Sequence, residues 1–213
     1  MRSLEFERFA AQAARCVAVI GFLYTALFVV VVENGARWAA ILTSILLLGG
    51  ALLSSVVFIA LYGRLHLIDP LISLWVTLLG FAAAIGSAMH GGYDLGILLK
   101  TPDAYSTDLA NFTDPRGLAT FGLAGVAILL FSWLMARTVE FPETLIRIGY
   151  GAAILVGLIY LGRLLFLNPK NPLTAIAAVL AGFVFTPVWY AWVGAILQHG
   201  ATSPSTGTAP PVL

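Results

Sequence analysis

The chain has 213 residues, of which 60% are apolar and 10% are charged, and its mean hydropathy is +0.97. So little polar surface cannot cover a water-soluble globule, and the composition therefore predicts a membrane protein. Apolar content this high excludes a disordered chain, and a single cysteine, Cys16, excludes an intrachain disulfide framework. The formal net charge of +1 offers no basic surface to a phosphate backbone, so nucleic acid is not an expected partner.

Charged residues are so sparse that the uncharged stretches between them can be compared with the roughly 20 residues that a helix needs to cross about 30 Å of hydrocarbon. These stretches are continuous and lack a two-residue alternation, which excludes a transmembrane β-barrel. The sequence predicts an all-α integral membrane protein with six transmembrane helices in one bundle. The expected transmembrane domain covers residues 14–199, with spans over about 14–33, 38–63, 70–91, 117–136, 146–167 and 172–197.

Three segments are expected outside the spans. Residues 1–13 are interpreted as a cytoplasmic amphipathic segment that lies on the membrane surface. Residues 92–116 form the one long connection, and the apolar residues after Asp94 fit either a re-entrant element or an amphipathic extension at the outer surface. Residues 200–213 are rich in Pro, Ser and Thr and are expected to form a disordered tail.

Lysine and arginine favour an orientation with both the N- and the C-terminus in the cytoplasm and the 92–116 loop outside the cell membrane. The margin in favour of this orientation is small. The inner side receives Arg2, Arg8, Arg15, Arg64, Arg137 and Arg147, and the outer side receives Arg37, Lys100, Arg116, Arg163 and Lys170. The acidic residues of the 92–116 loop support its export.

Small residues recur along one face of two spans. In the third span they are Gly80, Ala84, Ser87 and Gly91, and in the fifth they are Gly149, Ala153 and Gly157. Spacings of three and four place each set on one side of a helix, where small side chains let helices approach closely in lipid. The two stripes predict close packing between the third and fifth spans. A competing similarity, GRLHLIDP at 63–70 and GRLLFLNP at 162–169, indicates an inverted repeat of three plus three spans instead.

Ionisable side chains inside hydrocarbon are costly and usually face a cavity or a partner. Asp94 and Arg163 each follow the first glycine of their stripe by 14 residues, so the alignment of the two stripes places them in the same outer leaflet. His90, Tyr93 and Tyr160 lie nearby in register. These five residues are the predicted ligand-binding set of an outward-facing polar pocket. The alternative is that Arg163 reaches the outer headgroups while Asp94 lies in water.

The other charged residues do not predict a functional site, and the residues that several known membrane chemistries require are missing. Glu140, Glu143 and Arg147 around Pro142 are interpreted as an ordinary helix start, and Asp69 before Pro70 as a helix N-cap. The two lysines lie outside mid-membrane, which excludes a retinal-type Schiff base. The three histidines are too scattered for a haem, and clustered metal ligands are missing. The sequence therefore assigns no catalytic residue and no metal ligand, and it leaves any cofactor unknown.

Three functions remain open. The first is binding or transport of a small amphiphilic molecule, with Asp94 and Arg163 as ligand contacts. The second is a non-catalytic structural or accessory subunit of a larger membrane complex. The third is an intramembrane enzyme that acts on a lipid or an isoprenoid with His90 as acid or base and Asp94 as its orienting group. Expected partners are the lipid bilayer, a small amphiphilic ligand, and either further copies of the chain or other subunits.

Overall fold

The computed structural model describes residues 4–100, 117–166 and 171–202, and all regular structure in this part of the chain is helical. Six helical segments are long and apolar enough to cross a membrane, which confirms the predicted all-α membrane fold. The elements are α1 (Leu4–Asn34), α2 (Arg37–Leu65), α3 (Pro70–Lys100), the π-helical turn η2 (Leu118–Gly122), α4 (Leu123–Met135), α5 (Glu143–Phe166), α6 (Pro172–Leu180), the π-helical turn η3 (Ala181–Phe185) and α7 (Thr186–Thr202). Most of the 92–116 loop and of the C-terminal tail lies outside the described residues.

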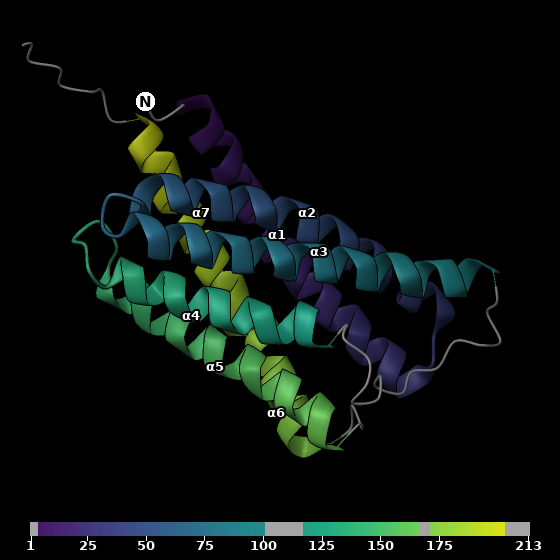
Figure 1. Ribbon diagram of the computed structural model, residues 1–213. Helices are drawn as coiled ribbons and strands as arrows, with labels where there is room; N and C mark the ends of the chain where they lie inside the picture. The colour runs from purple at the N-terminus through teal and green to yellow at the C-terminus, as the bar shows by residue number, and fades with distance from the viewer. Residues whose placement is uncertain (1–3, 101–116, 167–170, 203–213) are drawn as a thin grey trace, which may run out of the picture.

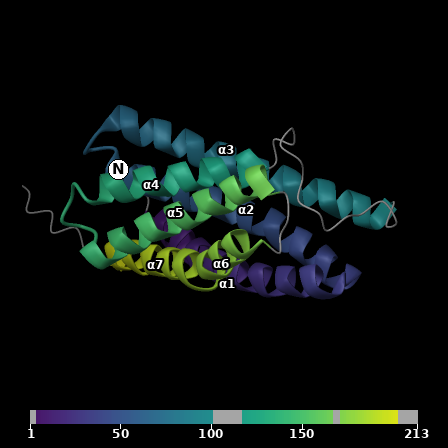
Figure 2. The same ribbon diagram turned by 90° about the horizontal axis from the view of Figure 1, so that it is seen from below.

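We divide the six spans, in chain order, into two groups of three that pack against each other in one bundle (Figures 1 and 2). The first group is α1, α2 and α3. The second is the fourth span (η2 and α4), α5, and the sixth span (α6, η3 and α7). The groups meet where α1 packs against α7 and η3, and where α3 packs against η2 and α4. We call the end where α1 begins and α2 and α7 end the Arg64 end, and the opposite end, where α3 and α5 finish, the Arg163 end.

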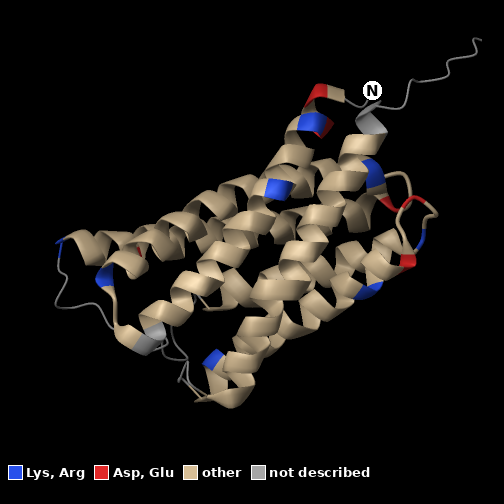
Figure 3. Ribbon diagram, turned by 180° about the vertical axis from the view of Figure 1, so that it is seen from behind, with Lys and Arg blue, Asp and Glu red and all other residues tan. Residues whose placement is uncertain are grey.

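The outside of the bundle is apolar along most of its length. Large apolar side chains such as Leu71, Ile85 and Leu165 are more than half exposed. Lysine, arginine, aspartate and glutamate gather towards the two ends, and the middle of the bundle is almost free of them (Figure 3). This distribution is the one expected of a protein that spans a bilayer.

The first and third spans are longer than predicted. Residues 4–13 are not a separate surface helix, because α1 runs without interruption from Leu4 to Asn34 and packs against α7. Its early alanines, Ala10 and Ala14, are completely buried. Similarly, α3 continues through Gly91 and Gly92 to Lys100, so residues 92–100 extend the helix and are not part of a loop. Burial inside the bundle stabilises both extensions where local propensity is weak.

The small-residue stripes allow close packing, but not between the third and fifth spans. α4 lies between α3 and α5, so that prediction is wrong. A methyl group built on Gly80 would lie 2.7 Å from the ring of Phe58, and one on Gly91 would lie 2.6 Å from the carbonyl oxygen of Ser44, both on α2. On α5, Gly149 faces Ser132 of α4 and Trp189 of α7. Each stripe therefore allows close packing between its own helix and the helices next to it.

One π-helical turn begins the fourth span and another interrupts the sixth, and neither was predicted. Each turn comes within atomic contact of the other group through a glycine. Gly86 of α3 lies against Ala119 in η2, and Gly182 in η3 lies against Thr25 of α1. The position of η3 has a simple cause, because Pro187 follows it and has no N–H to donate to the carbonyl four residues earlier.

A buried ion cluster joins the two groups at the Arg64 end. Arg64 is 5% exposed, and its Nε and Nη2 donate to the two carboxylate oxygens of Glu7 on α1 over 3.1 and 2.9 Å. Its Nη1 donates to Glu140 in the connection between α4 and α5. The planar guanidinium matches a carboxylate in this two-bond geometry. The cluster therefore fastens the α4–α5 connection to α1 and α2.

Candidate functional site

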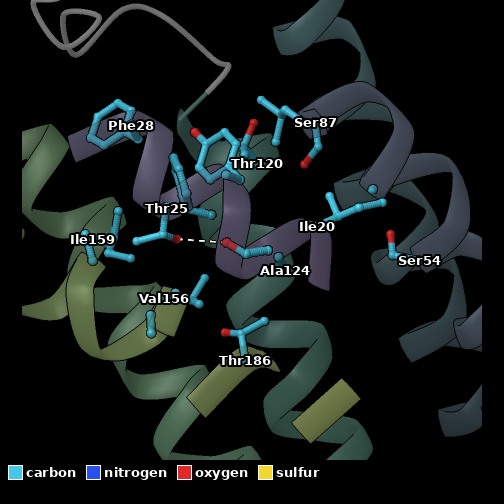
Figure 4. A pocket seen from close by; sticks show the side chains of 18 of the residues that line it. Ile20, Thr25, Phe28, Ser54, Ser87, Thr120, Ala124, Val156, Ile159 and Thr186 are labelled. Atoms are coloured by element: carbon cyan, nitrogen blue, oxygen red, sulfur yellow. Dashed lines mark hydrogen bonds between the residues drawn. The ribbon is translucent and has the colours of Figure 1, made fainter. Parts of the chain in front are cut away.

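A cavity of about 490 Å³ lies between the two groups, and all six spans contribute to its wall (Figure 4). On α1 its lining residues extend from Val17 to Val29, and on α2 from Leu46 to Phe58. At 1.5 Å per helical residue, each of these stretches is about 18 Å long. The lining includes both π turns, through Thr120 and Phe121 in η2 and through Ala181 and Gly182 in η3. The cavity is therefore elongated along the bundle axis.

Apolar side chains dominate the wall, and its polar groups are dispersed. Arg163 provides a positive charge near the Arg163 end, and Tyr190 and Ser54 lie deeper in the bundle. Hydroxyl groups of threonines lie between these positions. One of them, Thr25, donates to the carbonyl oxygen of Gly21 within its own helix over 3.0 Å (Figure 4). An apolar chamber with a few directed polar groups is typical of small-molecule sites.

Arg163 is the one predicted site residue that lines the cavity. It is partly buried, its guanidinium carbon lies 5.4 Å from the ring centroid of Phe121, and it approaches Gly117 at the start of the fourth span. These contacts turn the side chain towards the interior of the bundle. Ion pairs among the described residues join Asp94 to His90 and do not join it to Arg163.

His90 is buried between a carboxylate and a hydroxyl group. The residue is 8% exposed, its Nε2 lies 3.3 Å from Oδ2 of Asp94, and its Nδ1 lies 3.2 Å from Oγ1 of Thr120. Asp94 is one helical turn after His90 on α3, and the pair forms because α3 stays helical through the double glycine. Thr120 belongs to η2 and lines the cavity. The histidine therefore connects a carboxylate to the cavity wall.

The two predicted tyrosines do not line the cavity. Tyr93 is 58% exposed and points away from the interior of the bundle. Tyr160 is partly buried, and its ring lies against Gly122 at the end of η2, where a methyl group built on the glycine would be 3.4 Å from the ring. The five predicted residues therefore do not line one cavity together, because Arg163 lies in the wall of a mainly apolar cavity and the His90–Asp94 pair lies behind Thr120. Their role in ligand binding stays a prediction.

Sequence reasoning did not find Thr120, and it did not assign the residues of the sixth span that line the cavity to a site. An isolated threonine in an apolar helix gives no signal of its own, because threonine commonly bonds to its own helix backbone. Gly117 and Gly122, five residues apart in the sequence, are weak helix formers and gave only a weak local sign of irregular backbone. No family model, no curated protein and no solved structure matches this chain.

Proposed function

We propose that this membrane protein binds a small amphiphilic molecule in the cavity between its two groups of helices and carries it across the membrane. The observation that supports this most directly is the cavity itself. Its volume of about 490 Å³ falls in the range of small-molecule sites, and six spans that pack only to fill a bilayer would not need it. Its apolar length suits a hydrocarbon chain.

The presence of Arg163 in the cavity wall favours a ligand with a polar or anionic head group. A guanidinium in a membrane span is costly to retain, and it binds carboxylate or phosphate oxygens through two parallel hydrogen bonds. In this proposal the head group contacts Arg163 and the chain extends along α1 towards Tyr190 and Ser54. His90 and Asp94 act through Thr120, and Tyr93 and Tyr160 shape the surroundings without touching the ligand.

Transport, as opposed to storage, is supported by the arrangement of the two groups around the cavity. α1 packs against α7 and η3 but has little contact with α6, so on the α1 side the contact between the groups is lost towards the Arg163 end, whereas α3 and η2 stay in contact there. The buried ion cluster holds them together at the other end. We place the chain in the cell membrane with the Arg64 end in the cytoplasm, so the cavity is reached from outside.

The test is ligand binding to two variants in lipid nanodiscs, with radiolabelled decanesulfonate as a permanently anionic amphiphile. Gly21 lines the cavity and faces open space, so Gly21→Phe should fill the cavity without a clash at Cβ and lower the affinity at least tenfold. Gly157→Phe is the matched control, because Gly157 also faces open space but lies outside the lining. Equal affinities of the two variants would contradict the proposal.

The variant Arg163→Gln tests the contact with the head group of the ligand separately from the contact with its hydrocarbon chain. We expect it to lower the affinity for decanesulfonate about tenfold, because one charge-assisted contact is lost. The affinity for an uncharged decyl glycoside should stay unchanged. Arg147→Gln is the control, since Arg147 is exposed at the opposite end. A similar loss for both probes would indicate a packing role for Arg163. Stoichiometric copurification with other proteins, and no binding of either probe, would favour the accessory-subunit alternative instead.

A further inference from the structure

We propose that His90 is a proton-binding site that is coupled through the hydroxyl group of Thr120 to the ligand in the cavity. The inference rests on the proposed function and adds a second ligand, the proton, to the same cavity. It starts from three side chains that contact one another in succession: Asp94, His90 and Thr120. The distances are 3.3 Å from Asp94 Oδ2 to Nε2 and 3.2 Å from Nδ1 to Thr120 Oγ1.

In the neutral state of the ring, the partners of His90 determine where its proton lies. A carboxylate only accepts hydrogen bonds, so the proton belongs on Nε2, where it is donated to Asp94. Nδ1 then has a lone pair and accepts a hydrogen bond from the hydroxyl group of Thr120. With its proton directed at the ring, Thr120 presents only oxygen lone pairs to the cavity. The neutral state therefore favours a hydrogen-bond donor in the ligand.

Protonation of His90 reverses the polarity of this hydrogen bond. Both ring nitrogens of an imidazolium carry a proton, so Nδ1–H now donates to Oγ1 of Thr120. The hydroxyl proton is displaced from the ring, and Thr120 can donate it to an acceptor in the cavity that its side chain lines. The protonated state therefore favours a ligand with acceptor oxygens, such as a sulfonate, carboxylate or phosphate.

In the part of the chain that the structure describes, few charged groups surround His90. Among the described residues, Asp94 is the titratable group facing the ring from α3, and η2 contributes the uncharged Thr120. α2 approaches this part of α3 through Ser44 and Leu48, which carry no charge. Arg163 on α5 reaches Gly117, one helical turn before Thr120, and would oppose a positive ring. An anionic head group that accepts a hydrogen bond from Thr120 favours the protonated ring, so proton and anion stabilise each other through that hydroxyl group.

Burial makes the coupling specific to the cavity. His90 and Thr120 are 8% and 6% exposed, so bulk water does not solvate the hydroxyl group that changes its direction. Histidine is the side chain that ordinarily changes charge between about pH 5 and pH 8. A buried histidine beside a partly buried carboxylate in a membrane span is costly to retain, and a proton-binding role accounts for the pair.

The experiment measures the affinity of the full-length protein for decanesulfonate at pH 8 and pH 5, in nanodiscs of zwitterionic lipid. Sulfonate stays ionised over this range, so only the protein titrates. We expect wild type to bind about tenfold more tightly at pH 5, a typical size for coupling between two ligands. Calorimetry in buffers of different ionisation enthalpy should show proton uptake on binding at the intermediate pH.

Three variants separate the coupling from a structural effect. His90→Gln and Thr120→Val should each bind with the same affinity at both pH values, whereas Thr120→Ser should retain the pH dependence. Thr77→Val is the matched control, because Thr77 on α3 is buried, bonds to its own helix at Ser73 and does not line the cavity. Arg163→Gln should weaken binding at both pH values and keep the ratio. A wild-type affinity independent of pH, or an unchanged ratio in Thr120→Val, would overturn the proposal.

A measurement on the ligand-free protein distinguishes failure of the proton site from failure of the proposed function. If decanesulfonate binds at neither pH, the proposed function fails, and the proton site is judged from the ¹⁵N resonances of the histidine rings in the ligand-free protein. Three histidines are present, and the spectrum of His90→Gln identifies the ring in question. A change from the Nε2–H form to the doubly protonated ring between pH 8 and pH 5 supports the site. One unchanged form across this range contradicts it.

Discussion

Replacing Arg64 by alanine is expected to lower the free energy of unfolding by about 3–5 kcal/mol, the usual cost of removing one partner from a buried ion pair. The substitution leaves the carboxylate of Glu7, which is 5% exposed, without its guanidinium. It also removes the link from Glu140 to the first group of helices. The penalty is large because a carboxylate buried without compensation must be desolvated or protonated.

The measurement is thermal or denaturant unfolding in mild detergent, followed by circular dichroism. Arg147→Ala is the matched control, since Arg147 pairs with Glu143 on the surface, where both side chains are about three-quarters exposed. An exposed pair of this kind is worth about 0–1 kcal/mol. The triple variant Glu7→Leu, Arg64→Met, Glu140→Leu should recover most of the loss, because it removes the unpaired charges together. Equal destabilisation by the Arg64 and Arg147 changes would refute the structural role of the cluster.

Alanine at Gly91 is expected to lower stability, whereas alanine at Gly92 is expected to leave stability unchanged or raise it. A methyl group on Gly91 would lie 2.6 Å from the carbonyl oxygen of Ser44 and 3.0 Å from the amide nitrogen of Leu48. Both atoms belong to the α2 backbone, which cannot move aside like a side chain. The resulting separation of α2 and α3 should cost about 1–3 kcal/mol, the range for overpacked interiors.

Gly92→Ala controls for helix propensity at the adjacent position. Its methyl group would make an ordinary contact at 3.7 Å with the end of the Leu48 side chain. Alanine is favoured over glycine in a helix by about 1 kcal/mol, so this variant should be neutral or more stable. Unfolding of the two variants under identical conditions gives the comparison. Stabilisation by both changes would mean that α2 and α3 do not approach each other at Gly91.

The six spans were predictable because hydrocarbon thickness and the scarcity of charge determine them almost directly. Local signals at helix starts were equally informative. Asp69 was predicted as an N-cap, and its Oδ1 accepts a hydrogen bond of 3.0 Å from the amide of Ile72. The buried ion cluster was not predictable, because Glu7 and Arg64 are 57 residues apart and nothing local distinguishes them from surface charges. Long-range contacts of this kind depend on how the helices are arranged.

The candidate site shows the same division between local and long-range information. Four-residue spacing was enough to predict that His90 and Asp94 share a helix face, and the structure places them 3.3 Å apart. Matching Asp94 with Arg163 required knowledge of which helices are neighbours, and α4 lies between their helices. The cavity was beyond reach for a related reason. It is formed by apolar residues from all six spans, none of which differs in type from a residue that faces lipid.

The two π turns in the cavity wall have a consequence for how the wall can rearrange. A π turn closes its hydrogen bonds over five residues instead of four, so it holds one surplus residue. If that surplus migrates by one position, the residue it passes rotates by about 100° around the helix axis, the angle of one step in an α-helix. Thr120 in η2 and Ala181 in η3 are within reach of such a step. The fourth and sixth spans can therefore exchange the side chains they present without melting a single turn.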